Sequence, residues 1–428
     1  MFPLNAADHF TLMMDHEIRK SGLAGNLCAL VIELETCPDK DELSKKTRSF
    51  AQRFPLAVAS LQKTGRRYAW EERHKSPDIF FHHVCHDVKN SGTFQIETLK
   101  KIINKKQPLE DLLPVEVHLI ESEKNNQLVL RWFHPLCDAK GIELILHHII
   151  HQGQHQHNDA PAGVDAWLAK QGLWQKIKFA FKARNNIRQL DRLNSALLNP
   201  ADQPADTFDF QIVRYDKEQT AKINMLARQY AGMTGTALYF IGCMMRTLKT
   251  VGCDHQGDGF CVPYAFNLRK RKALFPIFGN HVSFLFSQAS HTQLKSKQQL
   301  FEHLKEQNKH SIRHSLDFAM LPLMEAGSWL NLDRFGEIVR KNPQATERSS
   351  FWFSYTGEMD PPMTEILGCN VTGLFQISPV TAPPSFGMLV SQLNGELTIS
   401  YCYIPQHVPE EKLVRITKQM SLELMDQA

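Results

Sequence analysis

A histidine and an aspartate, four residues apart, follow a hydrophobic run in the first half of the chain. The run covers residues 129–133, His134 ends it, and Asp138 lies in a short turn that closes at Gly141. Histidine titrates near neutrality without help and is therefore the usual general base. A histidine at the end of a strand is held rigidly and can still reach a cleft. The pattern therefore predicts a proton-accepting site at His134.

A buried carboxylate needs a cation beside it. The candidate partner of Asp138 is Arg269, which follows the strand-like residues 260–265 and the segment Phe266-Asn267-Leu268. We expect a bidentate Asp138–Arg269 ion pair that fixes the shape of the loop after His134.

The elements that must hold these residues are a sheet and the helix behind it. Strands are expected at 29–34, 79–84, 115–120 and 126–133, and the pair Asn125-Asn126 fits a hairpin turn between the last two. Residues 142–150 carry apolar side chains at helical spacing, and further helices are expected at 6–20 and 39–54. Two strands that lead directly to His134 would fix its backbone on a sheet.

The character of the chain changes between about 152 and 208. A polar, histidine-rich stretch at 152–161 and a basic stretch at 174–192 precede residues 199–206, which have the composition of a linker. We therefore place an N-terminal half at 1–195, a linker at 196–208 and a C-terminal half at 209–428. Strands are expected at 210–215, 260–265, 280–288, 351–356 and 397–403, and helices at 216–231, 235–250, 294–314 and 409–425. This order predicts a mixed α/β fold in which each half is a helix-covered sheet.

The composition is that of an ordinary globular protein. Of 428 residues, 43% are hydrophobic and 22% charged, and a net charge of +4 is too small to argue by itself for nucleic acid. Nine scattered cysteines without a CxxC pair indicate reduced thiols rather than a disulfide framework. The N-terminus lacks a signal-peptide pattern, and no run of apolar residues is long enough to span a bilayer. We expect a soluble, cytoplasmic monomer without a nucleic-acid partner.

The segment from His134 to Ala139 resembles the HxxxD signature of a superfamily of acyltransferases. That superfamily includes chloramphenicol acetyltransferase, plant BAHD acyltransferases, wax ester synthases and the condensation domains of peptide synthetases. Further segments resemble the family in the expected order: Asn267-Leu268-Arg269, Phe278 to Ser283, and Ser354-Tyr355-Thr356-Gly357. Residues 3–8 and 385–401 also match in position and character, so the resemblance covers essentially the whole chain.

The resemblance implies two sheet-and-helix halves with a channel between them and His134 near its middle. An acyl thioester, carried by coenzyme A or by the phosphopantetheine of an acyl carrier protein, would enter from one face. A small-molecule or lipid alcohol or amine would enter from the other. His134 would act as general base in a ternary complex without an acyl-enzyme, while Asp138 and Arg269 would be structural. The candidates for the oxyanion site and the channel are Ser354, Asn280 and the backbone amides from Ala139 to Gly141.

Three departures leave the subfamily and the donor open. Phe133 stands where condensation domains usually have a second histidine, Ala139 stands where many members have glycine, and residues 385–388 keep only the middle of an Asp-Phe-Gly-Trp-Gly motif. We favour coenzyme A as the carrier, and no tightly bound cofactor is expected. Either anionic carrier could use the basic residues Arg246, Lys249, Lys270, Arg271 and Lys272. No carrier or adenylation segment is fused, which indicates a stand-alone protein. The competing hypothesis is a non-catalytic docking or binding module that keeps the fold.

Other histidines have simpler interpretations. A second HxxxD pattern, from His83 to Asp87, has no apolar helix behind it and is interpreted as a sheet-edge cluster. His82, Cys85 and His86 would not converge on a metal, because successive strand positions alternate faces. His147, His151 and His155 share one helical face, but no carboxylate or thiolate completes a metal site. We therefore expect no metal.

The basic segment 174–184 carries Trp174, Ile177 and Phe181 on one helical face, with lysines and an arginine around them. One hypothesis is a helix that lies on a membrane surface, which would suit a lipid substrate. The alternative, which we favour here, is an inter-domain helix that docks on the core.

Overall fold

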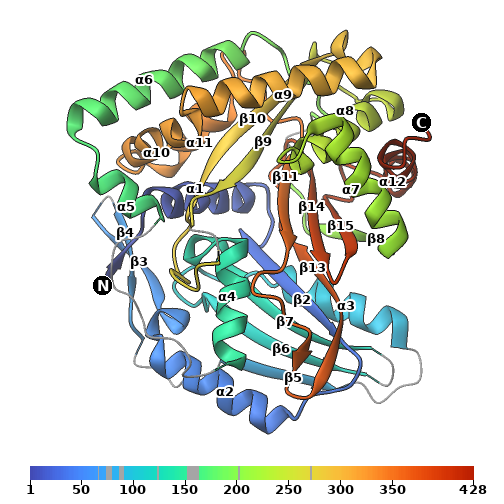
Figure 1. Ribbon diagram of the computed structural model, residues 1–428. Helices are drawn as coiled ribbons and strands as arrows, with labels where there is room; N and C mark the ends of the chain where they lie inside the picture. The colour runs from blue at the N-terminus through green and yellow to red at the C-terminus, as the bar shows by residue number, and fades with distance from the viewer. Residues whose placement is uncertain are drawn as a thin grey trace.

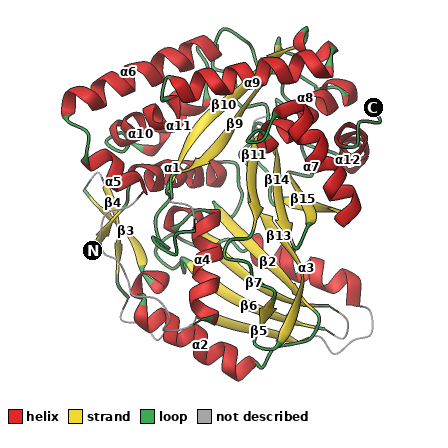
Figure 2. Ribbon diagram, in the orientation of Figure 1, coloured by secondary structure: helices red, strands yellow, loops and turns green. Residues whose placement is uncertain are grey.

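The computed structural model describes residues 1–65, 67–73, 80–85, 91–122, 125–151, 163–200, 203–269 and 272–428. Two six-stranded sheets, each covered by helices, form two lobes, which confirms the mixed α/β fold (Figures 1 and 2). Within these ranges, no helix is long and apolar enough to cross a bilayer.

The first lobe is built on a sheet with the strand order β12-β13-β2-β7-β6-β5. Helices α2 (Lys40–Arg53) and α4 (Ala139–Ile150) share a core with one face, and α3 (Ser91–Ile103) shares a core with the other. Every residue of β7 is buried, so the strand that leads to His134 is fixed from both sides. The strands are β12 (Glu365–Ile366), β13 (Cys369–Ile377), β2 (Leu27–Leu34), β7 (Asn126–Phe133), β6 (Val115–Glu121) and β5 (Phe81–Cys85).

The second lobe is built on a sheet with the strand order β10-β9-β11-β14-β15-β8. Its strands are β10 (Val282–Ser290), β9 (Gly259–Asn267), β11 (Trp352–Glu358), β14 (Phe386–Leu393), β15 (Glu396–Tyr403) and β8 (Asp209–Tyr215). Around it lie α7 (Lys217–Ala231), α8 (Thr236–Val251), α9 (Lys297–Arg313), α10 (Leu316–Gly327), α11 (Leu332–Arg340) and α12 (Glu410–Leu424). A small third sheet joins β1 (Phe2–Pro3), β4 (Arg67–Glu71) and β3 (Ser60–Thr64).

Segments from each predicted half of the chain enter the lobe of the other half. Strands β12 and β13 come from beyond residue 208, and β13 pairs antiparallel with β2, with Phe375 opposite Val31. Helices α5 (Gly163–Ala169) and α6 (Leu173–Leu190), which precede the predicted linker, pack on α10. The predicted division at 196–208 therefore separates the strands of the two sheets except for β12 and β13.

Helix α1 (Ala6–Lys20) lies between the two lobes (Figure 1). Asn5 caps its first turn, and Asp8 completes a capping box with the Asn5 backbone. Phe10 packs in the core of the second lobe, whereas Leu12 packs in the core of the first. Opposite faces of α1 therefore pack in the cores of the two lobes, beside the site.

Candidate active site

His134 is the first residue after β7 and opens a short 3-10 helix, His134–Leu136. Its backbone N–H donates to the carbonyl of Asn26 at 3.0 Å. Its own carbonyl accepts a hydrogen bond of 2.9 Å from the side-chain amide of Asn280, which belongs to the second lobe. The backbone of His134 is therefore held by groups from both lobes.

The imidazole of His134 lines a cavity of about 270 Å³ between the lobes. Burial lowers the pKa of His134, although its own backbone, the charge of Asp138 and the side chain of Asn280 oppose this shift. A lowered pKa favours the neutral form of the ring at neutral pH. A neutral imidazole at a cavity wall can accept a proton from a bound substrate.

Asp138 and Arg269 form a buried ion pair across the two lobes. A terminal guanidinium nitrogen of Arg269 donates to the Oδ2 of Asp138 at 2.5 Å. The Oδ1 of Asp138 accepts instead from the backbone amide of Gly141 and so caps α4. The expected bidentate geometry is therefore wrong, because one carboxylate oxygen is committed to the helix.

The remaining donors of Arg269 bind the loop between β9 and β10. They contact the carbonyls of Pro276 at 3.0 Å and Gly279 at 3.2 Å. This loop reaches down beside α4 in Figure 1, and the backbone amide of His281 also donates to Asp138 at 2.8 Å. Burial by itself would raise the pKa of Asp138, but the Arg269 charge and these hydrogen bonds outweigh it, so the pKa lies below its ordinary value.

Asp8 and His281 are two site residues that sequence reasoning did not identify. The Oδ1 of Asp8 accepts from both the backbone and the side-chain amide of Asn280, at 2.6 and 2.8 Å. Burial raises the pKa of Asp8 to about 7, although the hydrogen bonds of Asn280 and Asn5 oppose the shift. The only sequence signal for Asp8 was its position in the opening segment 3–8. No local pattern indicates its contact with Asn280, which lies 272 residues further along the chain.

The structure corrects the expectations for Gly141 and Asn280. The amide of Gly141 is already bonded to Asp138, so it is not available to an oxyanion. The first two amides of α4, of Ala139 and Lys140, have no partner within the helix, and both residues line the cavity. Asn280 is fully buried and holds the carbonyl of His134 rather than lining the channel.

Ser354 lies on β11, is partly exposed and lines the same cavity as His134. The cavity wall around it is mainly apolar. Phe10, Met14 and Ile18 contribute from α1, and Trp352, Phe353, Met388 and Leu389 contribute from the second sheet. A cavity of this composition favours a substrate with an apolar part next to the reacting group.

Of the five predicted basic residues, the three that the structure describes do not line the His134 cavity. Arg246 on α8 pairs with Glu423 at 2.8 Å, and Lys249 donates to the carbonyl of His291. Lys272 is exposed in the loop between β9 and β10, whereas Lys270 and Arg271 lie outside the described residues. The carboxylate of Glu423 already compensates Arg246, which removes it as a free cation for an anionic carrier.

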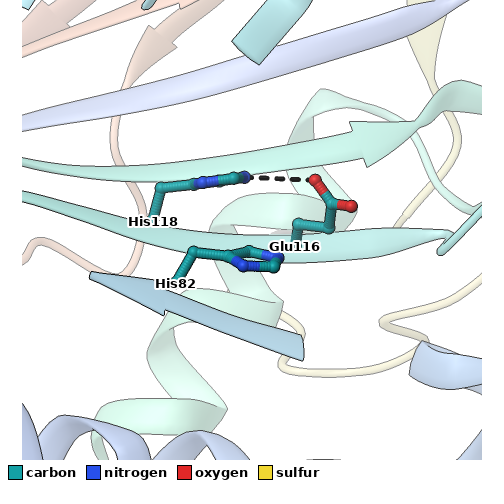
Figure 3. Close-up of side chains that lie close together, drawn as sticks. All are labelled: His82, Glu116 and His118. Carbon is teal, nitrogen blue, oxygen red and sulfur yellow. Dashed lines mark hydrogen bonds and ion pairs between the residues drawn. The ribbon is translucent and has the colours of Figure 1, made fainter. Parts of the chain in front are cut away.

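A group of two histidines and a carboxylate lies on the first sheet (Figure 3), and none of the three residues lines the His134 cavity. His118 bonds Glu116 at 3.1 Å, and Arg131 pairs with the same carboxylate at 2.7 Å. The rings of His82 and His118 are stacked, with centroids 4.7 Å apart, and one nitrogen of each lies within 4.8 Å of the other and of the Glu116 carboxylate. Burial alone would raise the pKa of Glu116, but His118 and Arg131 lower it to about 2. Arg131 already compensates the charge of the Glu116 carboxylate, so an ion-pair network accounts for this group of side chains.

The other histidine hypotheses are only partly covered by the described residues. His83 lies on β5 and bonds Glu121 at 2.9 Å, whereas His86 and Asp87 lie outside the described residues. The rings of His147 and His151 lie 4.6 Å apart at the end of α4, and His155 lies outside the described residues.

No protein-family model matches the chain, and no curated protein matches it significantly. Among solved structures, the chain is similar to the trichothecene 15-O-acetyltransferase of Fusarium sporotrichioides, with a TM-score of 0.75, 8% identity, and coverage of 99% of this chain and 94% of that one. The chain is also similar to the first condensation domain of the CDA synthetase, with a TM-score of 0.72, 14% identity, and coverage of 100% of this chain and 97% of that one. For the wax ester synthase/diacylglycerol acyltransferase of Marinobacter aquaeolei the TM-score is 0.58 and the identity 14%, with coverage of 99% of this chain and 98% of that one. At these identities the likeness shows the fold, which is the two-lobed fold of the superfamily that the HxxxD resemblance indicated.

Proposed function

We propose that this protein transfers an acyl group from a thioester to a hydroxyl or amine, with His134 as the general base. The observation that carries the proposal is the position of His134 at the cavity wall, with its backbone held by both lobes. The fold supports it further, because the similar structures include an acetyltransferase and a wax ester synthase.

The reaction would proceed in one ternary complex. The acceptor gives its proton to His134 as its oxygen or nitrogen attacks the thioester carbonyl, and a tetrahedral oxyanion forms. The hydroxyl of Ser354 and the amides of Ala139 and Lys140 are the donors that can face this charge. When the carbon–sulfur bond breaks, the thiolate takes the proton from the imidazolium. The products are an ester or amide and a free thiol, and no acyl-enzyme forms.

The donor would be an acyl-CoA or an acyl carrier protein, and it is a co-substrate rather than a bound cofactor. The apolar cavity walls favour an acyl chain or an acceptor with substantial apolar surface. Acceptors of this kind include lipid alcohols and hydrophobic amines.

The test is a panel of acyl-CoA donors of increasing chain length, each combined with apolar alcohols and amines. Free thiol is measured for the wild type and for His134→Ala. We expect acceptor-dependent thiol release that falls by about 10²–10⁴-fold in the variant, which is the usual contribution of a general base. Equal rates for both proteins on every pair would overturn the proposal and indicate a non-catalytic binding or docking protein.

A further inference from the structure

Helix α6 presents an apolar face to solvent. The exposed fractions are 72% for Leu173, 82% for Trp174, 37% for Ile177 and 58% for Phe181. Trp174, Ile177 and Phe181 follow helical spacing, so they form one stripe along the first half of the helix. Contiguous exposed apolar side chains of this kind mark an interaction surface more often than a single exposed residue does.

The opposite face of α6 already holds the helix on the protein. Ala183 and Leu190 are buried, and Phe179 packs against the core of the second lobe. Lys176 pairs with Glu325 of α10 at 2.8 Å, and Lys182 donates to the carbonyl of His314. The expectation that the helix docks on the core is therefore met by other side chains, and the stripe of Trp174, Ile177 and Phe181 remains uncovered.

The charged side chains of α6 itself are all positive. Residues 173–190 contain no Asp or Glu, and Lys178, Arg184 and Arg188 are exposed. No carboxylate in the described part of the chain pairs with any of these three cations. An uncompensated row of cations next to exposed Trp and Phe is complementary to an anionic, partly apolar surface.

One more exposed tryptophan lies near the start of α6. Trp329 is 58% exposed, and it lines a cavity of about 570 Å³ together with Lys176 and Leu168. The guanidinium of Arg67 lies 3.6 Å from the centre of its ring. Trp329 and Arg67 therefore add another aromatic and another cationic side chain near the start of α6.

We propose that α6 is a membrane-surface helix that docks this protein on a bilayer with anionic lipid headgroups. Leu173, Trp174, Ile177 and Phe181 insert at the boundary between headgroups and acyl chains, and Lys178, Arg184 and Arg188 contact lipid phosphates. This inference does not depend on the proposed acyl transfer, because it rests on a surface separate from the His134 cavity. An acidic protein partner is less favoured, since it would leave the exposed tryptophan and phenylalanine at a highly charged surface.

The test is co-sedimentation of the full chain with vesicles of phosphatidylcholine alone and of phosphatidylcholine mixed equally with phosphatidylglycerol. We expect at least about tenfold tighter binding to the anionic vesicles, because each cation near such a surface contributes roughly fivefold. The pair Trp174→Ser/Phe181→Ser should weaken binding by about tenfold or more. The pair Lys178→Glu/Arg184→Glu should remove the preference for anionic lipid and most of its sensitivity to salt.

Matched controls come from α7 and the turn that follows it. Met225 and Met233 are 56% and 86% exposed, and Lys217 and Arg228 are exposed cations. Met225→Ser/Met233→Ser and Lys217→Glu/Arg228→Glu should leave vesicle binding unchanged, and all variants should keep the wild-type melting temperature. Two results would overturn the proposal. One is that the wild type does not bind anionic vesicles, and the other is that both α6 variants bind them as tightly as the wild type does. Absent vesicle binding together with a raised KM for a carrier-bound donor in the α6 variants would assign the helix to a protein partner instead.

Discussion

At the scale of single residues, the sequence identified some of the side chains that form the site but not all of their contacts. His134 and Asp138 could be predicted from their spacing, and Arg269 from the need of a buried carboxylate for a cation. It could not be predicted that Arg269 binds only one carboxylate oxygen of Asp138, because this depends on the other oxygen, Oδ1, capping α4. The contact between Asp8 and Asn280 could not be predicted either, since it joins residues far apart in the chain.

Removal of the Asp138 carboxylate should destabilise the protein as well as impair activity. Asp138→Ala leaves Arg269, whose side chain is 2% exposed, without its counter-charge, and it uncaps α4. We expect a loss of about 3–5 kcal/mol in the free energy of unfolding, measured by urea denaturation at neutral pH. Because the folded-state pKa of Asp138 lies below its ordinary value, this stabilisation is present above the unfolded pKa and is lost as the pH falls through the lowered one.

Asp333→Ala is the matched control, since Asp333 pairs with Lys20 at the surface and its side chain is 58% exposed. It should change the free energy of unfolding by less than about 1 kcal/mol. A similar small effect for Asp138→Ala would contradict a buried, stabilising ion pair.

At the scale of elements, the site depends on the contact between the start of α4 and the loop from β9 to β10. Strand β7 and helix α4 could be predicted, because their apolar patterns are long and regular. Strand β13 was not predicted, because Asn370 and Gly373 interrupt its pattern and its partner β2 lies more than 300 residues earlier. The packing of the loop on α4 is a tertiary contact that no local pattern encodes.

Gly141 tests this contact. Replacement of glycine by alanine usually stabilises a helix by about 1 kcal/mol. At Gly141 a Cβ would lie 2.7 Å from the carbonyl oxygen of Ile277 and from the Cβ of Cys137. We therefore expect Gly141→Ala to destabilise the protein by about 1–3 kcal/mol and to lower the rate of transfer, because the loop that holds Asp138 must shift.

The control is Gly172→Ala, at the start of α6, where a Cβ would meet no atom within 4 Å. There we expect a change of only a few tenths of a kcal/mol in either direction. If thermal and chemical unfolding show Gly141→Ala to be as stable as the wild type, the close packing of α4 against the loop is not required.

At the scale of the whole molecule, the two lobes are built on separate sheets, and segments from each half of the chain enter the lobe of the other half. The mixed α/β class could be predicted from the alternation of helices and strands. The exchange of segments could not, because composition marks a linker at 196–208 but does not show that β13 returns to the first sheet. Helix α1 and the Asp138–Arg269 pair join the same two lobes at the site.

A fragment of residues 1–208 should therefore not fold alone. Without β13, strand β2 would become an exposed edge with unpaired backbone groups and a largely apolar surface. We expect the fragment to aggregate or to unfold without cooperativity, as followed by circular dichroism and size-exclusion chromatography, while the full chain remains cooperative. A monomeric fragment with a sharp unfolding transition would show that the first lobe is independent of β13.

The pH dependence of kcat/KM tests the role of His134 most directly. Burial lowers the pKa of His134, and only the neutral imidazole can accept the acceptor's proton. The rate should therefore fall on the acid side, be half-maximal below the ordinary histidine pKa of about 6.5, and be level at neutral pH. The residual rate of His134→Ala should lack this inflection. A half-maximal pH at or above the ordinary value, or the same inflection in the variant, would contradict His134 as the base.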